Sequence, residues 1–190
     1  MRQQSLLFPA LFSKLDTRKR LTVLDVGPAF PETLAFFSSL RCRLCFADLY
    51  NFALVRGGCG DLSREEIRAA FTDYLDLPKG IQFDLCLLWD FPNYLPDQVL
   101  TAFGLALEPY LHARTWAHGF AVRTPETRLD NRWYGIDQPH LFTLRKPWYS
   151  QPRIYPHSQA ILINLLTCLD IDRGMLLPDG RLEVVMARSR

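Results

Sequence analysis

The chain has 190 residues, of which 48% are hydrophobic and 22% charged, a balance typical of one globular domain with a buried core. Lysine and arginine total 22 against 20 acidic residues, and the net charge of +2 gives no argument for nucleic acid or a membrane surface as partner. No apolar run approaches the roughly 20 residues that span a bilayer. The sequence therefore predicts that no segment of the chain spans a membrane.

The first 20 residues, MRQQSLLFPALFSKLDTRKR, join a basic residue to a short apolar stretch that Pro9 interrupts and that Lys14 and Asp16 close. Because no small-residue cleavage site follows, we interpret residues 1–20 as an amphipathic leading helix rather than a signal peptide. The five cysteines are an odd number in a chain without an export signal. They indicate reduced thiols and a cytoplasmic location.

Cys42 and Cys45, in CRLC, have the spacing of half a zinc site, but no second Cys or His pair follows at a finger-like distance. The surrounding residues also have the composition of a strand, on which positions three apart face opposite sides of the sheet. We therefore expect no metal, and thiols that pack as small apolar side chains.

Apolar runs alternate with amphipathic segments along the chain, which indicates a parallel sheet covered on both faces. The predicted strands span residues 21–26, 42–48, 83–90 and 115–123, with a further short strand near 70–74. The first expected helix lies near 31–39, with Pro31 in its first turn. A second begins with a capping box formed by Ser63 and Glu66, and a third follows Pro96 for about 15 residues.

The periodicity breaks down over residues 124–156, where Pro, Trp, Tyr and Arg accumulate. A helix over 157–169 follows, and then two apolar segments, 170–177 and 181–188, that PDG joins into an antiparallel hairpin. We therefore predict a single α/β domain, residues 1–190. Its Rossmann-like, mostly parallel sheet would have seven strands, helices on both faces, an antiparallel C-terminal strand, and 124–156 as an insertion between strands five and six.

Acidic residues stand near the ends of the early strands. Asp25 comes just before the turn at Gly27, Asp48 closes the second strand, and Asp73 precedes the fourth. Ligands of open α/β sheets bind at the carboxyl ends of the strands. An acid about 20 residues beyond a glycine turn can accept hydrogen bonds from both ribose hydroxyls. Together these acids predict a nucleotide cofactor.

At these positions the sequence resembles a known family. TVLDVGPA, FADLY, DYLDLP and FDLCLLWDFPNYL are similar to successive motifs of the class I methyltransferases that use S-adenosylmethionine, and the resemblance covers roughly residues 20–190. The DVGPA turn and the LLPDGRLEVVMAR ending resemble a group of small bacterial methyltransferase-like proteins. The resemblance implies methyl transfer from S-adenosylmethionine to an acceptor, a small molecule or a protein, that the sequence does not identify.

For the methionine end of the cofactor, the resemblance implies that Asp25 bonds the amino group through water and that Gly27, Pro28 and Ala29 approach the methionine moiety. The loop departs from the family pattern, which favours glycine where Ala29 and Pro31 stand. Proline removes a backbone donor and fixes φ. S-adenosylmethionine carries no phosphate, so its demand for close glycine approach is weaker than that of a dinucleotide.

For the adenosine end, the resemblance implies that Asp48 holds the ribose hydroxyls and that Leu49 lies against the adenine. Asp73 would face the adenine amino group, with Tyr74 beside it. The pocket would be lined, after the fourth strand, by Trp89 and Asp90.

Methyl transfer depends mainly on alignment of the acceptor with the methyl group, so the sequence identifies no catalytic residue. Candidates for contacts to a substrate or partner lie after the fourth strand and in residues 124–157: Asn93, Tyr94, Trp133, Tyr134, His140, Tyr155 and His157. Each also has a purely structural interpretation, as a turn, a helix cap or a cover over the sheet edge.

The segment 124–157 mixes basic with aromatic side chains, among them Arg128, Arg132, Trp148 and Tyr149. Such a mixture is typical of a substrate lid with snorkelling arginines, of a protein interface and of a surface for nucleic acid, and we favour these in that order. The alternative to an enzyme is a methyltransferase-like scaffold that has lost catalysis and binds a protein partner through residues 124–157. A nucleotide-dependent oxidoreductase is disfavoured, because a pyrophosphate would require the glycines that this loop lacks.

Overall fold

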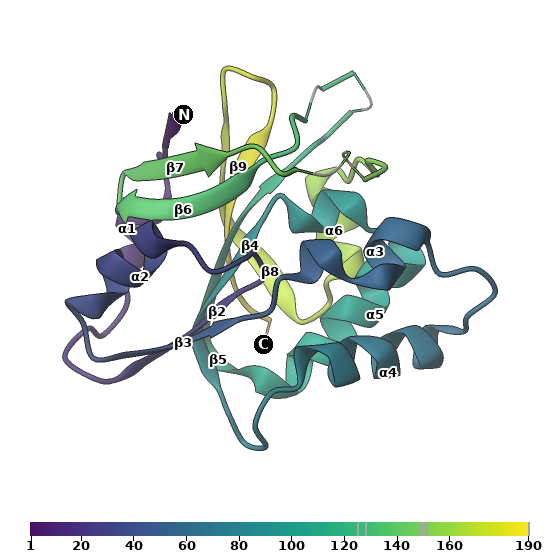
Figure 1. The fold of residues 1–190 in the computed structure, drawn as a ribbon, viewed down its shortest axis with the longest axis horizontal. Helices are drawn as coiled ribbons and strands as arrows, with labels where there is room; N and C mark the ends of the chain where they lie inside the picture. The colour runs from purple at the N-terminus through teal and green to yellow at the C-terminus, as the bar shows by residue number, and fades with distance from the viewer. Residues whose placement is uncertain (125, 128, 149, 151, 190) are drawn as a thin grey trace.

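A computed structural model of the chain describes residues 1–124, 126–127, 129–148, 150 and 152–189. Arg128 and Tyr149, two members of the basic and aromatic mixture, lie outside the described residues. The described chain forms a six-stranded sheet and a three-stranded sheet, with helices packed around the larger one (Figure 1).

The larger sheet is mostly parallel. Its strands lie in the order β3 (Cys42–Phe46), β2 (Leu21–Asp25), β4 (Phe83–Trp89), β5 (Leu111–Ala121), β9 (Leu182–Arg188) and β8 (Leu169–Leu176). The first four are mutually parallel, whereas β9 is antiparallel to both of its neighbours. The prediction of an antiparallel C-terminal strand is confirmed. The carboxyl ends of β2, β3 and β4 consequently meet at one edge of the sheet.

The short strand predicted near residues 70–74, third of the seven expected along the chain, is wrong. That segment belongs to α4 (Arg64–Leu75), and the described residues of this sheet form six strands. Ile67, Phe71 and Leu75 are buried at a spacing of four, which places them on one face of a helix. The capping box expected at Ser63 and Glu66 is present and starts this helix.

Helices cover both faces of the larger sheet, which is seen nearly edge-on in Figure 1. On one side lie α3 (Ala53–Gly57), α4, α5 (Asp97–Leu107) and α6 (Gln159–Leu165). On the other side lie α1 (Phe8–Phe12), α2 (Pro31–Ser38) and the smaller sheet. Three short 3₁₀ turns complete the described elements: η1 (Leu49–Asn51), η2 (Phe91–Tyr94) and η3 (Glu108–Tyr110).

The smaller sheet takes two of its three strands from the segment that showed no periodicity, residues 124–156, and the third from the N-terminal segment. It contains β1 (Arg2–Gln4), β7 (Leu141–Arg145) and β6 (Trp133–Gln138) in that order, all antiparallel. The interpretation of 124–156 as irregular is therefore wrong for the β6–β7 hairpin. The hairpin lies against α2: Ile136 N donates to Thr33 Oγ1 at 3.1 Å.

Two helix boundaries also differ from the prediction. The leading segment, expected to be helical over 1–20, is a strand followed by the five-residue α1, because Pro9 is compatible only with the first turn of a helix. The helix expected over 157–169 is the shorter α6, and β8 begins at Leu169. None of the described helices combines the length and apolar character of a membrane span.

Candidate functional site

The site begins at the end of β2, where the Asp25 carboxylate is buried. Its Oδ1 accepts hydrogen bonds from Gly27 N at 2.8 Å and from Trp89 Nε1 at 2.7 Å. Its Oδ2 is buried and has no hydrogen-bond partner among the described residues. Burial raises the pKa of Asp25 to about 7, although the two hydrogen bonds oppose this rise. The carboxyl group therefore changes charge near neutral pH.

Trp89 covers Gly27. A Cβ atom at Gly27 would lie 3.5 and 3.6 Å from Cδ1 and Nε1 of the Trp89 ring, and 3.1 Å from Asp25 Oδ1. Trp89 adopts a left-handed backbone conformation, φ 51°, which is strained for a bulky residue. The indole also lies parallel to the Tyr134 ring, with centroids 5.1 Å apart. The space against Gly27 is thus filled by the Trp89 ring, and this ring in turn packs on Tyr134.

Asp48 stands at the end of β3, beside the same loop. Its backbone is left-handed, φ 43°, and its N–H donates to Gly27 O at 3.3 Å. Its Oδ2 accepts a hydrogen bond from Asn51 Nδ2 at 2.7 Å, whereas Oδ1 is buried without a partner among the described residues. Burial raises the pKa of Asp48, against the hydrogen bond from Asn51. Asp48 therefore keeps one acceptor oxygen that this chain does not use.

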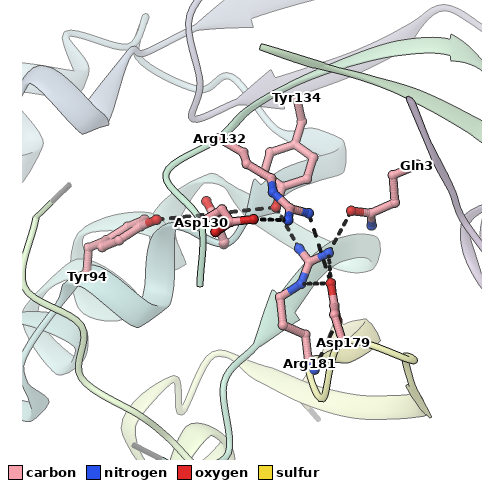
Figure 2. A network of polar contacts seen from close by, with 8 residues as sticks. Gln3, Tyr94, Asp130, Arg132, Tyr134, Asp179 and Arg181 are labelled. Carbon is pink, nitrogen blue, oxygen red and sulfur yellow. Dashed lines mark hydrogen bonds and ion pairs between the residues drawn. The ribbon is translucent and has the colours of Figure 1, made fainter. Parts of the chain in front are cut away.

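Asp90, directly after β4, is fully buried and lies among tyrosines. Its Oδ1 accepts from Tyr50 OH at 2.5 Å, and its Oδ2 from Tyr134 OH at 3.2 Å and Tyr94 OH at 3.5 Å. Burial raises the pKa of Asp90 to about 6, although the hydrogen bond from Tyr50 and the charge of Arg181 oppose it. Arg181 Nη1 also donates to Tyr134 OH at 2.7 Å, as Figure 2 shows. Tyr134 thus joins the hairpin to the ends of β4 and β9.

The other residues predicted for the cofactor lie around this edge with differing exposure. Leu49 is fully buried, Pro28 is half-buried and Ala29 is exposed. Asp73 and Tyr74 are exposed on α4 rather than at a strand end, because the strand expected there is absent. Tyr74 OH still reaches Asp48 O at 3.3 Å, so the end of α4 approaches the end of β3.

Among the predicted substrate or partner residues, Tyr94 and Tyr134 meet at Asp90, and Trp133 packs near Phe30 with ring centroids 5.9 Å apart. Asn93 has a structural role. Its side-chain nitrogen donates to Asp90 O at 2.8 Å and to Phe120 O at 2.7 Å, and its oxygen accepts from Val122 N at 2.7 Å.

Among the described residues, the remaining three candidates make no side-chain hydrogen bond to Asp90. His140 is exposed at the β6–β7 turn. Tyr155 is half-buried, with Arg153 over its ring at 5.3 Å. His157 is buried, and its Nε2 lies 3.0 Å from Leu95 O.

Sequence reasoning missed Tyr50 and Arg181. Tyr50 stands two residues after Asp48, and its burial at Asp90 depends on the η1 turn that follows β3. Arg181 is only 2% exposed, and it follows the turn that joins β8 to β9. Spacing along the chain could not reveal either one, since each meets Asp90 or Tyr134 from a distant strand end.

No protein-family model matches the sequence, and no curated protein matches it. Solved structures do resemble the fold. The N-methyltransferase NodS from Bradyrhizobium japonicum, solved with S-adenosylhomocysteine, is similar at 15% identity and a TM-score of 0.52, over 96% of this chain and 86% of that chain. The 1,6-didemethyltoxoflavin-N1-methyltransferase from Burkholderia thailandensis was solved with 1,6-didemethyltoxoflavin and S-adenosylhomocysteine bound. It is similar at 13% identity and a TM-score of 0.51, over 96% of this chain and 77% of that chain.

The fold is that of the S-adenosylmethionine-dependent methyltransferases. The pyocyanin biosynthetic protein PhzM is also similar, at 13% identity and a TM-score of 0.50, over 97% of this chain. The chain spans 55% of the length of PhzM.

S-adenosylmethionine, the cofactor associated with this fold, has an adenosine half and a methionine half. The side chains at the ends of β2, β3 and β4 do not suit the two halves equally well. At the adenosine half, Asp48 Oδ1 is a buried acceptor without a partner, as ribose hydroxyls require. At the methionine half, Asp25 Oδ2 is likewise unused, but the Trp89 ring lies in front of Gly27. The adenosine half therefore offers one unused acceptor oxygen, whereas at the methionine half the Trp89 ring occupies the space against Gly27.

Proposed function

We propose that this protein binds S-adenosylmethionine at the carboxyl edge of β2, β3 and β4 and transfers its methyl group to an acceptor. One observation carries this proposal: the carboxylates that end two adjacent strands, Asp25 and Asp48, each keep a buried oxygen without a partner among the described residues. Buried polar atoms are nearly always hydrogen-bonded, so two unused acceptors at one strand edge favour a polar ligand there. The methyltransferase fold supports the choice of ligand.

In this proposal Asp48 accepts hydrogen bonds from the ribose hydroxyls, and Asp25 faces the amino group of the methionine half. When bound, S-adenosylmethionine supplies a methyl group already activated on a sulfonium. The chain then has to orient the acceptor and exclude water. Asp90 and its tyrosines lie next to Trp89, at the end of the central strand β4, where an acceptor would meet the methyl group.

Binding of the whole cofactor would require rearrangement of Trp89 and Tyr134. Both rings are almost fully buried and stacked, and Tyr134 is held by Asp90 and Arg181. We propose that the β6–β7 hairpin, which carries Tyr134, is displaced when the cofactor enters. The left-handed conformation of Trp89 favours this idea, because the release of a strained backbone lowers the free energy.

A second candidate function remains from the sequence: a scaffold that binds a protein partner through residues 124–157. The observation in its favour is the same aromatic stack, which would leave no room for the methionine half if the hairpin never moved. Trp148, 81% exposed in this segment, is the kind of side chain that protein interfaces bury.

Thermal unfolding in the presence of ligand separates the two candidates. A ligand at 100 times its dissociation constant stabilises the folded state by about 2.7 kcal/mol, which raises the melting temperature of a protein of this size by a few degrees. We expect this rise with S-adenosylmethionine and with S-adenosylhomocysteine, but not with NAD. An unchanged melting temperature with all three would exclude the enzyme and favour the scaffold.

A further inference from the structure

A basic surface hollow lies beside the Tyr134 stack, between β1, the β6–β7 hairpin and the turn that joins β8 to β9. Its volume is about 450 Å³, and it is lined by Arg2, Arg132 and Arg181 against a single acid, Asp179. A second hollow of about 410 Å³ adjoins it, since both are lined by Arg132 and Leu144. The second adds two further cations, Arg145 and Lys146, and one acid, Asp130. Cations thus outnumber acids among the lining residues, while Arg2 pairs with Asp137 and Arg145 with Glu32 at the border of the hollows.

Inside the first hollow, Gln3 has an unused donor. Its Oε1 accepts from Arg181 Nη2 at 2.6 Å, which turns its Nε2 away from the arginine. Gln3 Nε2 is buried and has no hydrogen-bond partner among the described residues. A buried N–H group without an acceptor is costly, so this position suits a ligand that brings an acceptor oxygen.

The arginines around this donor are held in place by acids. Arg181 is 2% exposed, and its Nε and Nη2 donate to Asp179 Oδ2 at 2.9 and 2.7 Å. Arg132 pairs with Asp130 and lies 4.0 Å from Asp179. Figure 2 shows Gln3 and Arg132 on either side of the Arg181 guanidinium. Guanidinium groups fixed in this way offer planar donors that match a carboxylate or a phosphate.

The same hollow also has an apolar wall. Leu6, Leu144, Leu177 and Pro178 contribute to its lining, and Leu6 is 51% exposed. An anion with no apolar body would leave these side chains in water, whereas a small molecule with an apolar body would cover them. The lining therefore combines a charged end with an apolar end.

From this arrangement we infer a binding site for a small molecule that carries a carboxylate or phosphate group on an apolar body. The anionic group accepts from Gln3 Nε2 and lies between Arg2, Arg132 and Arg181, while the apolar body packs on Leu6 and Leu177. This inference does not depend on methyl transfer. Arg181 donates to Tyr134, which stacks on Trp89, so this site adjoins the proposed cofactor site. The two sites are nevertheless distinct.

The test uses inorganic phosphate and butyrate as probes, at constant ionic strength, with binding followed by NMR chemical-shift titration of the whole chain. We expect at least one probe to bind and to shift the amides of β1 and of the β8–β9 turn. Phosphate binding without butyrate binding would assign a phosphoryl ligand, and the reverse a carboxylate. Binding of neither probe would overturn the inference.

Two variants localise the binding. Gln3→Met removes the unused donor, together with the oxygen that accepts from Arg181, at similar volume, and Arg132→Gln removes one cation. Each substitution should lower the affinity for the probe about tenfold, as expected for loss of a hydrogen bond to a charged group. Arg114→Gln, which lines a hollow at the opposite end of β5, is the matched control and should bind as the wild type. Should Gln3→Met not fold, Arg132→Gln decides alone, and unchanged affinity in that variant would contradict the assignment.

Discussion

The indole of Trp89 stacks on the ring of Tyr134, with centroids 5.1 Å apart and planes 5° from parallel. One ring belongs to the end of the central strand β4 and the other to the β6–β7 hairpin, so the contact joins the two sheets. Because Trp89 also lies over Gly27, this single contact closes the methionine half of the proposed cofactor site. The same contact makes the closure testable by substitution.

Trp89→Leu should expose Gly27 and increase the affinity for S-adenosylhomocysteine, by about tenfold if the closed arrangement is populated ten times more than the open one. Calorimetric titration measures this directly. Trp116→Leu, in the middle of β5 and in contact with Lys14, is the control and should leave the affinity unchanged. Equal or weaker affinity in Trp89→Leu would mean that the ring is part of the site rather than its cover.

Asp25→Asn should change how stability depends on pH. The pKa of Asp25 in the folded state is about 7, above the value of about 3.9 expected in the unfolded chain. Between these values the folded state holds a proton that the unfolded state has lost, so stability from this group is complete at low pH and falls as pH rises to about 7. The fall is about 1.4 kcal/mol per pH unit within that window.

Urea denaturation at pH 5, 6, 7 and 8 checks this expectation. From pH 5 to pH 7 the wild type should lose about 2–3 kcal/mol of unfolding free energy relative to Asp25→Asn. Above pH 7 the difference between the two proteins should stay constant. Titration of Asp90 contributes equally to both proteins and cancels. A pH-independent difference would show that the Asp25 carboxyl group is not protonated in the fold.

Tyr50→Phe removes the shortest hydrogen bond to the buried Asp90 carboxylate, 2.5 Å long. At pH 8, where this carboxylate is ionised because its pKa is about 6, the loss should cost about 1.5–3 kcal/mol of stability, as for other hydrogen bonds to charged groups. Tyr110→Phe, at a partly exposed tyrosine on η3, should change the unfolding free energy by less than about 0.5 kcal/mol. Similar values for the two variants would show that Asp90 does not depend on its tyrosines.

Gly119→Ala tests the close approach of β5 to the end of β4. A Cβ atom at residue 119 would lie 2.8 Å from Trp89 O, a backbone atom that cannot rotate away. We expect a destabilisation of roughly 1–3 kcal/mol, typical of overpacking, and a changed environment for the Trp89 indole N–H in NMR spectra. Gly57→Ala, where a Cβ would meet nothing within 4 Å, should be neutral in the same denaturation experiment.

Where hydrophobic periodicity was strong, the fold could be predicted from the sequence. The apolar run 83–90 is β4, and Pro31 begins α2 as expected. The segment 70–74 is helical instead of a strand, because Ile67, Phe71 and Leu75 form a buried stripe at helical spacing. The hairpin does carry a strand signal: Phe142 and Leu144 alternate with more exposed neighbours, which is the period of a strand.

The site itself was only partly predictable. Asp25 and Asp48 lie at neighbouring strand ends because parallel strands share a carboxyl edge. The burial of Trp89 over Gly27 depends on an unusual backbone angle, and its partner Tyr134 comes from a hairpin far along the chain. No local pattern encodes a contact between residues so distant in sequence. The sequence therefore gave no indication that Trp89 and Tyr134 cover the loop at Gly27.

The most direct measurement is calorimetric titration of S-adenosylhomocysteine into the wild type, Asp48→Ala and Asp170→Ala. Asp48 Oδ1 is the unused acceptor proposed for the ribose, whereas Asp170 is exposed on β8, at the opposite edge of the large sheet. We predict binding to the wild type and to Asp170→Ala with equal affinity, and a loss of at least tenfold in Asp48→Ala. Equal affinity in all three proteins, or no binding to the wild type, would contradict the proposed cofactor site.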